Sequence, residues 1–296
     1  MFNNPEFTKF AKNYKYSSDH QEKTIQRILN TFRKMGLEDY TFFPKEDKTI
    51  YHFTSVKSAK EILGNATLRF GEASNFNDSR DMDINIIDFD TDKETFMNYT
   101  REYFSISDPK HLEAVSKRFD ALPKEIRINE LHKRINETIQ YVGIICFSEE
   151  PSNHLLWSHY ANNERGVCIG IKMSALKNAI VSKVKYSGNM IKAKYYDLEI
   201  DALIYWGYLK SSHWAYEKEI RALCLDTSET CDENRCIPLD KNLVDEIYFG
   251  VRTPKDDVND IINLLQTNNY PDSIKLFKML NNPNEFNYLE PKKIMY

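Results

Sequence analysis

The stretch YVGIICFSEEPSNHLLWSHYANNERGVCIGIK, residues 141–172, carries the clearest signals of the fold. Its two apolar ends, YVGIICFS and GVCIGIK, are rich in β-branched residues and predict two buried strands. The segment between them carries WSHYA and predicts a helix between the two strands. A sheet into which helices are inserted is therefore the expected architecture.

Further strand-like runs lie on both sides of this stretch. They are TIYHFTS and TLRF before it, and KVKYSG, EIRALCL and DEIYFGVR after it. Apolar residues at helical spacing separate several of these runs, without a regular alternation of strand and helix. This pattern predicts an α+β fold with a mixed or antiparallel sheet and helical insertions.

The chain divides into three predicted parts. Residues 1–48 are expected to form a helical N-terminal extension, because apolar residues recur there at helical spacing and Gly36 provides a stop signal. Residues 49–253 are expected to form the α+β core. Residues 254–296 are expected to form a C-terminal helical extension packed on that core.

The composition excludes several classes of protein. Glycine is scarce, with 9 residues among 296, which argues against glycine-rich nucleotide-binding loops. The formal net charge of -4 disfavours constitutive binding to duplex DNA, because proteins that rely on phosphate contacts are normally basic. The 5 cysteines form no CxxC pair, so no metal is expected.

Apolar segments are short throughout the chain. None approaches the ~20 residues that span a bilayer, so no membrane contact is expected. The N-terminal residues MFNNPEFTKFAKNYKYSSDH have no apolar core and do not resemble a signal peptide. A cytoplasmic location is therefore the expectation.

Four short motifs could carry chemistry, and the first two lie near the start of the core. On a strand, His52 and Thr54 share one face and could line a pocket, although His52 could equally be a satisfied residue at a strand end. The run NFND at residues 75–78, followed by several charged residues, favours a structural turn that could border a pocket.

The third motif is HLLWSHY, residues 154–160. On a helix, its two histidines point about 140° apart, which makes chelation of one metal by the pair an unfavourable interpretation. Trp157 and Tyr160 share a helix face. A place in the core is the favoured interpretation for both, and an aromatic wall for a planar ligand is the alternative.

The fourth motif is WAYEKEIR, residues 214–221. On a strand, Glu217, Glu219 and Arg221 line one face, with the two carboxylates ~7 Å apart. Such carboxylates can stabilise an oxocarbenium-like centre or take a proton from a nucleophile. The alternative is a surface network in which Arg221 neutralises a neighbouring glutamate.

These motifs in order resemble a bacterial family of unknown function, DUF2971. The matching pieces are YHFTS, NFND, IICFSEEPSNHLLWSHYANNERGVCIGI, HWAYEKEIRAL and IYFGVR. The resemblance covers residues 50–255 and implies no activity of its own.

The opening of the core is also similar to that of the ADP-ribosyltransferase fold, because a YHFT strand precedes a short helix and a small strand. This resemblance implies an NAD-dependent ADP-ribosyltransferase that acts on a protein or nucleic acid. The resemblance to the bacterial family adds the expectation that the protein is a toxin or antiphage effector. The resemblance to the ADP-ribosyltransferase fold implies that His52 contacts the ribose of NAD and that Glu219 or Glu217 is the catalytic carboxylate. In this hypothesis His52, Tyr160 and Glu219 border one cleft.

The same resemblance implies a set of NAD-binding residues. Tyr160 or Trp157 would hold the nicotinamide, and Arg69, Arg80 or Arg165 would contact the pyrophosphate. The full set expected around NAD is His52, Thr54, Tyr160, Trp157, Arg69 and Arg80.

Two other functions remain open from the residues. One is a non-catalytic sensor module that binds a nucleotide or a partner. The other is a nuclease or hydrolase that uses His52, Asp78 and Glu219.

Overall fold

The computed structural model describes residues 47–103, 107–176, 179–190, 192–198, 205–224, 227 and 231–294. Residues 1–46 of the expected N-terminal extension lie outside this range. Most of the core and of the C-terminal part lies inside it, and so do all four motifs.

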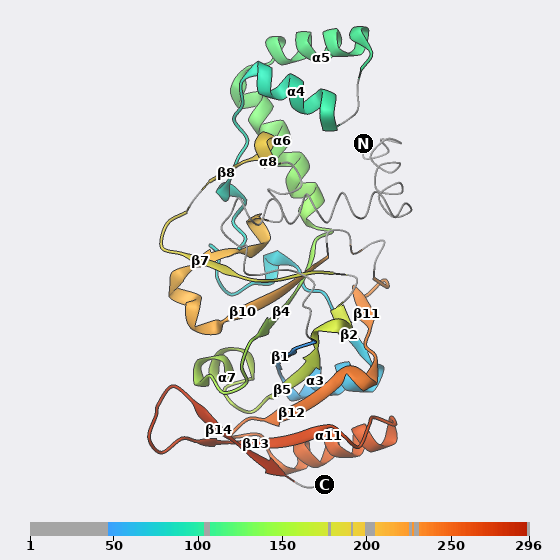
Figure 1. The fold of residues 1–296 in the computed structure, drawn as a ribbon, viewed down its shortest axis with the longest axis vertical. Helices are drawn as coiled ribbons and strands as arrows, with labels where there is room; N and C mark the ends of the chain where they lie inside the picture. The colour runs from blue at the N-terminus through green and yellow to red at the C-terminus, as the bar shows by residue number, and fades with distance from the viewer. Residues whose placement is uncertain are drawn as a thin grey trace.

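An eight-stranded sheet forms the centre of the molecule (Figure 1). Its strand order is β14-β13-β12-β5-β1-β4-β10-β6. Neighbouring strands are antiparallel, except for the parallel pair β12 and β13. The strands are β1 Thr49–Thr54, β4 Gly143–Ser148, β5 Val167–Lys172, β6 Ile180–Lys183, β10 Glu219–Cys224, β12 Val244–Phe249, β13 Lys275–Asn281 and β14 Leu289–Ile294. An α+β fold with a large, mostly antiparallel sheet is therefore confirmed.

Short strands and helices connect and cover this sheet. The paired short strands are β2 Thr67–Arg69 with β11 Cys236–Pro238, β3 Ile87–Asp88 with β8 Ala193–Lys194, and β7 Lys185–Ser187 with β9 Leu209–Ser211. The α-helices are α3 Val56–Asn65, α4 Lys93–Tyr103, α5 Pro109–Ala121, α6 Lys124–Ile139, α7 His154–Tyr160, α8 Tyr195–Leu198 and α11 Lys255–Thr267. The 3-10 helices are η1 Ala73–Asn75, η2 Ile84–Ile86, η3 Met173–Leu176, η4 Ser212–Glu217 and η5 Lys241–Leu243.

The C-terminal part differs from a purely helical extension. Its helix α11 is present, but residues 275–294 form β13 and β14. Strand β13 pairs with β12 in parallel and β14 then closes one edge of the main sheet. This part therefore completes the sheet of the core instead of only packing on it.

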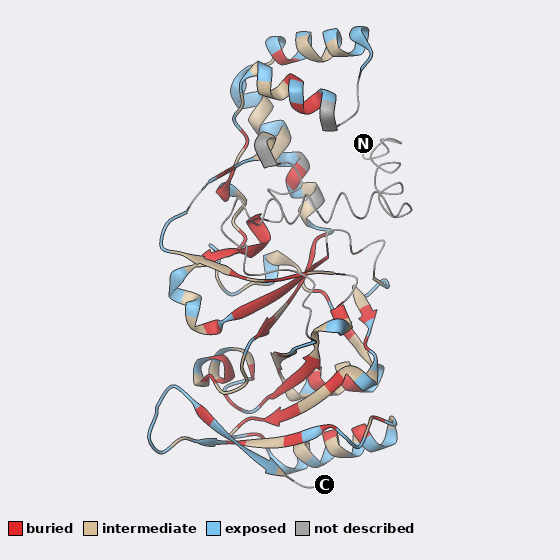
Figure 2. Cartoon of the chain, in the orientation of Figure 1, coloured by how far each residue is buried: buried red, intermediate tan, exposed pale blue. Residues whose placement is uncertain are grey.

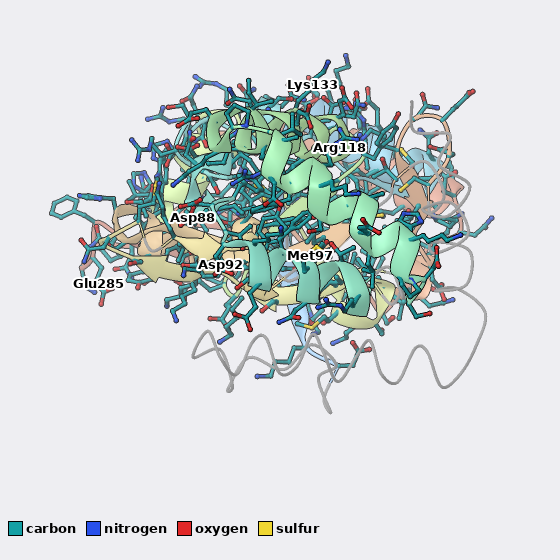
Figure 3. The ribbon with its side chains drawn as sticks, turned by 90° about the horizontal axis from the view of Figure 1, so that it is seen from above. Asp88, Asp92, Met97, Arg118, Lys133 and Glu285 are labelled. Atoms are coloured by element: carbon teal, nitrogen blue, oxygen red, sulfur yellow. The ribbon has the colours of Figure 1, made fainter. Side chains whose placement is uncertain are left out.

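Helices α4, α5 and α6 form a group at one end of the molecule (Figure 1). The view from above shows Met97 and Arg118 on this group, with Glu285 at the edge of the molecule (Figure 3).

Among the residues that the structure describes, no helix combines the length and the apolar character needed to cross a membrane.

The side of the sheet that we call the apolar face holds the largest core cluster. Ile50, Phe147 and Ile169 point to this side and are at most 3% exposed. Leu63 of α3 and Ile261 of α11 pack in the same cluster. Figure 2 shows buried residues concentrated along the strands of the sheet. This face is a conventional hydrophobic core covered by two helices.

The opposite side, which we call the charged face, is different. Directly paired residues of neighbouring antiparallel strands lie on the same side of a sheet. Tyr51 pairs with Ser148, and Ser148 pairs with Glu219, so these three residues share the charged face. Helix α7 contributes the fully buried Trp157 to an apolar cluster on this side. The charged face therefore combines apolar packing with buried ionisable groups.

Candidate functional site

Strand β10 supplies two members of a buried charged cluster. Glu219 and Arg221 are two residues apart and share a face, as the sequence pattern predicts. The Arg221 Nε donates to Glu219 Oε1 at 2.7 Å, and a second guanidinium nitrogen donates to Oε2 at 3.1 Å. Arg221 is 0% exposed. The alternative of a surface network is therefore wrong, because this ion pair lies in the interior.

Glu217 reaches the same place by another route. It ends the 3-10 helix η4, and Lys218 then adopts a left-handed conformation with φ of 44° before β10 begins. The prediction that Glu217 lies on the strand is therefore wrong. The carboxylates of Glu217 and Glu219 nevertheless share one ammonium group. Lys210 Nζ lies 2.6 Å from Glu217 Oε2 and 2.9 Å from Glu219 Oε2.

The turn that follows NFND contributes a third carboxylate. Asp81 Oδ2 lies 2.5 Å from an Arg221 nitrogen and 3.4 Å from Lys210 Nζ. Its other oxygen, Oδ1, is buried and has no hydrogen-bond partner among the described residues. The charged cluster is thus formed by Asp81, Lys210, Glu217, Glu219 and Arg221, with three acidic and two basic side chains.

Sequence patterns missed two members of this cluster. Asp81 occurs in a polar turn, where acidic residues usually serve the local backbone. Lys210 follows the aromatic run YWGYL, and a lysine in such surroundings signals a buried, paired cation. Asp81 and Arg221 lie 140 residues apart in sequence, so no local pattern links them.

A partly accessible rim lies beside the charged cluster. The Tyr160 hydroxyl donates to Glu217 Oε1 at 2.6 Å, and Asn77 Nδ2 donates to the Tyr160 oxygen at 3.3 Å. Trp214 Nε1 donates to Asp78 Oδ2 at 2.7 Å. The indole ring of Trp214 also lies 5.1 Å from Lys210 Nζ. The rim therefore joins α7, the NFND turn and η4 around the buried charges.

The environment separates the pKa values of the two glutamates. Burial raises the pKa of Glu217 above its ordinary value, and Lys210 only partly opposes this effect. Burial also acts to raise the pKa of Glu219, but Arg221 and Lys210 outweigh it and lower that pKa to about 2. Burial and the neighbouring Glu217 raise the pKa of Tyr160, which therefore stays a hydrogen-bond donor. Glu219 is ionised, and Glu217, with the higher pKa, is the group suited to accept a proton.

A family comparison identifies the segment that carries most of this site. Residues 156–222 match the family model DUF2971, a protein of unknown function. The DUF2971 resemblance is thereby confirmed. The DUF2971 segment begins inside α7 and ends in β10, and so includes Tyr160, Lys210, Glu217, Glu219 and Arg221. No curated protein and no solved structure matches the chain.

His52 lies outside the DUF2971 segment and on the other side of the sheet. It follows Tyr51 on β1, and Tyr51 shares the charged face with Glu219, so His52 points to the apolar face. Its ring lies 5.6 Å from that of Phe147, a member of the apolar cluster. The expectation that His52, Tyr160 and Glu219 border one cleft is therefore wrong.

The surroundings of His52 match a satisfied structural histidine. Its Nδ1 lies 2.9 Å from the carbonyl oxygen of Cys146. Burial lowers the pKa of His52, so the neutral ring is favoured. Thr54 shares this face and is buried at the end of β1. The structure does not bring His52 together with Asp78 and Glu219, the set expected for a nuclease, because Asp78 lies at the rim with Trp214 on the side of Glu219.

The remaining expected NAD contacts are distributed over several regions. Trp157 is 0% exposed, donates from Nε1 to the Pro151 carbonyl and packs at 5.2 Å against Phe53, so it is a core residue. Arg69 lies on β2, which pairs with β11, and its Nε donates to the Asn234 carbonyl. Arg80 is exposed next to the rim, since its backbone nitrogen donates to an oxygen of Asp78.

Three carboxylates in one cluster are a pattern that can bind a cation. Within the part of the chain that is described, no three His, Cys, Asp or Glu side chains are arranged to hold a metal ion. The Lys210 ammonium instead lies among the three carboxylates of the charged cluster. The positive charge that these carboxylates need is therefore supplied by the chain itself.

Proposed function

We propose that this protein is an enzyme of glycosyl transfer, with NAD as its ADP-ribosyl donor and Glu217 and Glu219 as its catalytic residues. The supporting observation is that two carboxyl groups share the ammonium group of Lys210 while their pKa values are shifted in opposite directions. Pairs of this kind assign one group to remain ionised and the other to exchange a proton during the reaction. The proposal assigns no part in catalysis to His52.

Each carboxylate has a defined task in this reaction. The bond between ribose C1′ and the nicotinamide nitrogen breaks, and its electron pair leaves with nicotinamide. Positive charge develops on the ribose, and the ionised Glu219 stabilises it. A new bond forms between C1′ and an oxygen or nitrogen of the acceptor, whose proton passes to the carboxylate of Glu217. A raised pKa makes that carboxylate a stronger base than an ordinary glutamate.

The rim supplies groups suited to NAD. Trp214 and Tyr216 have ring centroids 6.0 Å apart and offer aromatic surface to a planar ring. Tyr160 can exchange its bond to Glu217 for one to a ribose hydroxyl. Arg80 is exposed beside the NFND turn and can pair with the pyrophosphate. These four residues replace the larger set expected from the sequence.

The acceptor that we propose is a macromolecule, either a protein or a nucleic acid. The protein would then act as a bacterial toxin or antiphage effector. This role rests on the resemblance to the bacterial DUF2971 family. Digestion of the labelled product with protease or nuclease separates the two acceptor classes.

The test uses purified protein, NAD labelled in the adenylate part and a bacterial lysate. We expect label in macromolecules and release of free nicotinamide. Glu217→Gln and Glu219→Gln should each lower the rate by about 10²- to 10⁴-fold, the range for loss of an acid–base group. Glu150→Gln is the matched control, because Glu150 pairs with the exposed Lys218 outside the charged cluster. Wild-type activity in both glutamine variants, or no nicotinamide release by the wild type, would refute the proposal.

A second candidate is a module that binds a nucleotide or partner without turnover. It is favoured by one observation: every carboxylate oxygen of Glu217 and Glu219 already has a donor within the charged cluster or the rim. Such a paired cluster stabilises the fold without reacting. Titration calorimetry with NAD and ADP-ribose separates the two candidates, since heat of binding without nicotinamide release supports the module.

A further inference from the structure

The chain leaves α7 through an unusual backbone turn. Asn162, Asn163 and Glu164 have φ values of 47°, 53° and 66°. Three consecutive residues other than glycine therefore adopt the left-handed conformation. Asparagine tolerates this conformation, whereas glutamate adopts it only at an energetic cost. Such strain persists where surrounding contacts hold the backbone in place.

Backbone contacts fix the strained residue Glu164. Its nitrogen donates to the Trp157 carbonyl at 3.1 Å, and its carbonyl accepts from the Arg252 nitrogen at 3.0 Å. Gly250 lies so close that a Cβ atom there would come within 2.2 Å of the Glu164 carbonyl oxygen. The turn is thus held against the interior of α7 on one side and against the end of β12 on the other.

The side chain of Glu164 adds a contact across the whole of α7. Glu164 is only 8% exposed, and its Oε1 lies 2.7 Å from Nε2 of His154. His154 is the first residue of α7, and Glu164 lies four residues beyond the last, Tyr160. The guanidinium Nε of Arg252 lies 3.6 Å from the other carboxylate oxygen. The His154–Glu164 pair therefore joins the two ends of the helix.

Both ends of α7 also contact the segment that carries Glu217. At the end of the helix, the Tyr160 hydroxyl donates to Glu217 Oε1 at 2.6 Å. At its start, Asn153 Nδ2 donates to the Tyr216 carbonyl at 2.7 Å. A rotation of this seven-residue helix would therefore move Tyr160 relative to Glu217.

We propose that Glu164 and His154 are positioning residues for Tyr160. Their contact holds the end of α7 so that the Tyr160 hydroxyl meets the Glu217 carboxylate. Both residues act through Tyr160, which is the group at the rim. The consequence for catalysis rests on the proposed function, whereas the position of Tyr160 can be measured without it.

The first experiment measures the environment of Tyr160 directly. 3-Fluorotyrosine at position 160 gives a fluorine resonance that reports the hydrogen bond to Glu217. We expect Glu164→Ala and His154→Ala to shift this resonance in the direction produced by Glu217→Gln. Glu164→Gln retains an acceptor for His154 and should restore the wild-type resonance. Glu290→Ala, on the exposed part of β14, is the control and should have no effect. A wild-type resonance in Glu164→Ala would overturn the proposal.

The second experiment measures nicotinamide release. Glu164→Ala should lower kcat by about 10- to 100-fold and also raise KM for NAD, because a displaced Tyr160 neither holds the Glu217 carboxylate in place nor reaches the ribose. Glu164→Gln should recover most of kcat. A wild-type enzyme that turns over and is unaffected by Glu164→Ala overturns the positioning role. A wild-type protein without turnover refutes the proposed function, and the fluorine resonance still decides the role of Glu164.

Discussion

The two faces of the central sheet hold buried residues of opposite kinds. On the apolar face, side chains such as Ile50 and Ile169 pack against α3 and α11. On the charged face, Glu219 lies within hydrogen-bond distance of both Arg221 and Lys210. The same strands supply both faces, because successive side chains alternate in direction. Residues adjacent in sequence therefore experience different dielectric environments and different consequences of mutation.

The two faces contribute to the free energy of unfolding in different ways. An apolar side chain can be shortened at the cost of a cavity, and its neighbours lose only contacts. A buried ion is different, because its removal leaves its partners charged and uncompensated. We therefore expect the charged face to show the larger and the more pH-dependent effects.

The largest effect is expected for Arg221→Ala. This change leaves the carboxylates of Asp81 and Glu219 buried without their main partner, and it should lower the free energy of unfolding by about 3–5 kcal/mol. Urea denaturation at neutral pH measures it. Arg69→Ala, an exposed arginine on β2, is the control and should change stability by less than about 0.5 kcal/mol. A loss for Arg221→Ala no larger than that of the control would contradict the contrast between faces.

A smaller effect, of about 3 kcal/mol, is expected for Ile169→Ala on the apolar face. The change creates a cavity among uncharged groups, so the loss should be the same in mildly acidic and in neutral buffer. Ile169→Val, which removes a single methylene, should cost about 1 kcal/mol. A loss that varies with pH would mean that the two faces are electrostatically coupled.

At acidic pH the protein should lose the stability that the ionised Glu219 contributes. Glu219 has a pKa of about 2 in the folded protein, below its ordinary value of 4.5, so the unfolded chain binds this proton more tightly. The stability that Glu219 contributes is complete above pH 4.5 and declines as the pH falls toward 2. The slope reaches about 1.4 kcal/mol per pH unit.

The difference in unfolding free energy between the wild type and Glu219→Gln, followed through this pH range, checks the prediction. Glu217 has the opposite sign, because its raised pKa favours proton binding by the folded state. Glu217→Gln therefore provides the comparison, and parallel curves for the wild type and Glu219→Gln would refute the assignment.

The smallest effect is expected for His52→Gln. Glutamine can still donate to the Cys146 carbonyl, so stability should fall by only about 1 kcal/mol. Nicotinamide release should remain at the wild-type rate, because His52 lies on the face opposite Glu219. If His52→Gln lowered the rate of nicotinamide release as much as Glu219→Gln, the apolar face would also take part in function, and the contrast between the faces would be wrong.

Local patterns predicted several elements well. The runs YVGIICFS and GVCIGIK form β4 and β5, and HLLWSHY forms α7. These predictions succeed because strand and helix periodicities are properties of short segments. Residues 275–294 were expected to belong to a helical extension, but they form β13 and β14. Strand β14 is exposed along most of its length and includes Pro291, so it lacks the usual pattern of a strand.

The proximity of Glu217 and Glu219 was predicted, but its structural cause was not. Glu217 and Glu219 do lie close together, but Lys210 joins them, not a common strand face. Local patterns do not single out Lys210 and Asp81, because their partners are remote in sequence or belong to other elements. A buried cation in an aromatic run was the available signal for Lys210.

Local periodicity in the sequence sets which segments form strands, and it places His52 and Tyr51 on opposite sides of their own strand. The pairing of distant strands then places Tyr51, and not His52, on the face of Glu219. Side-chain alternation is a local property with a period of two residues, whereas the face shared by distant strands depends on strand order and register. In this protein the register of β1, β4 and β10 therefore separates the histidine from the charged cluster.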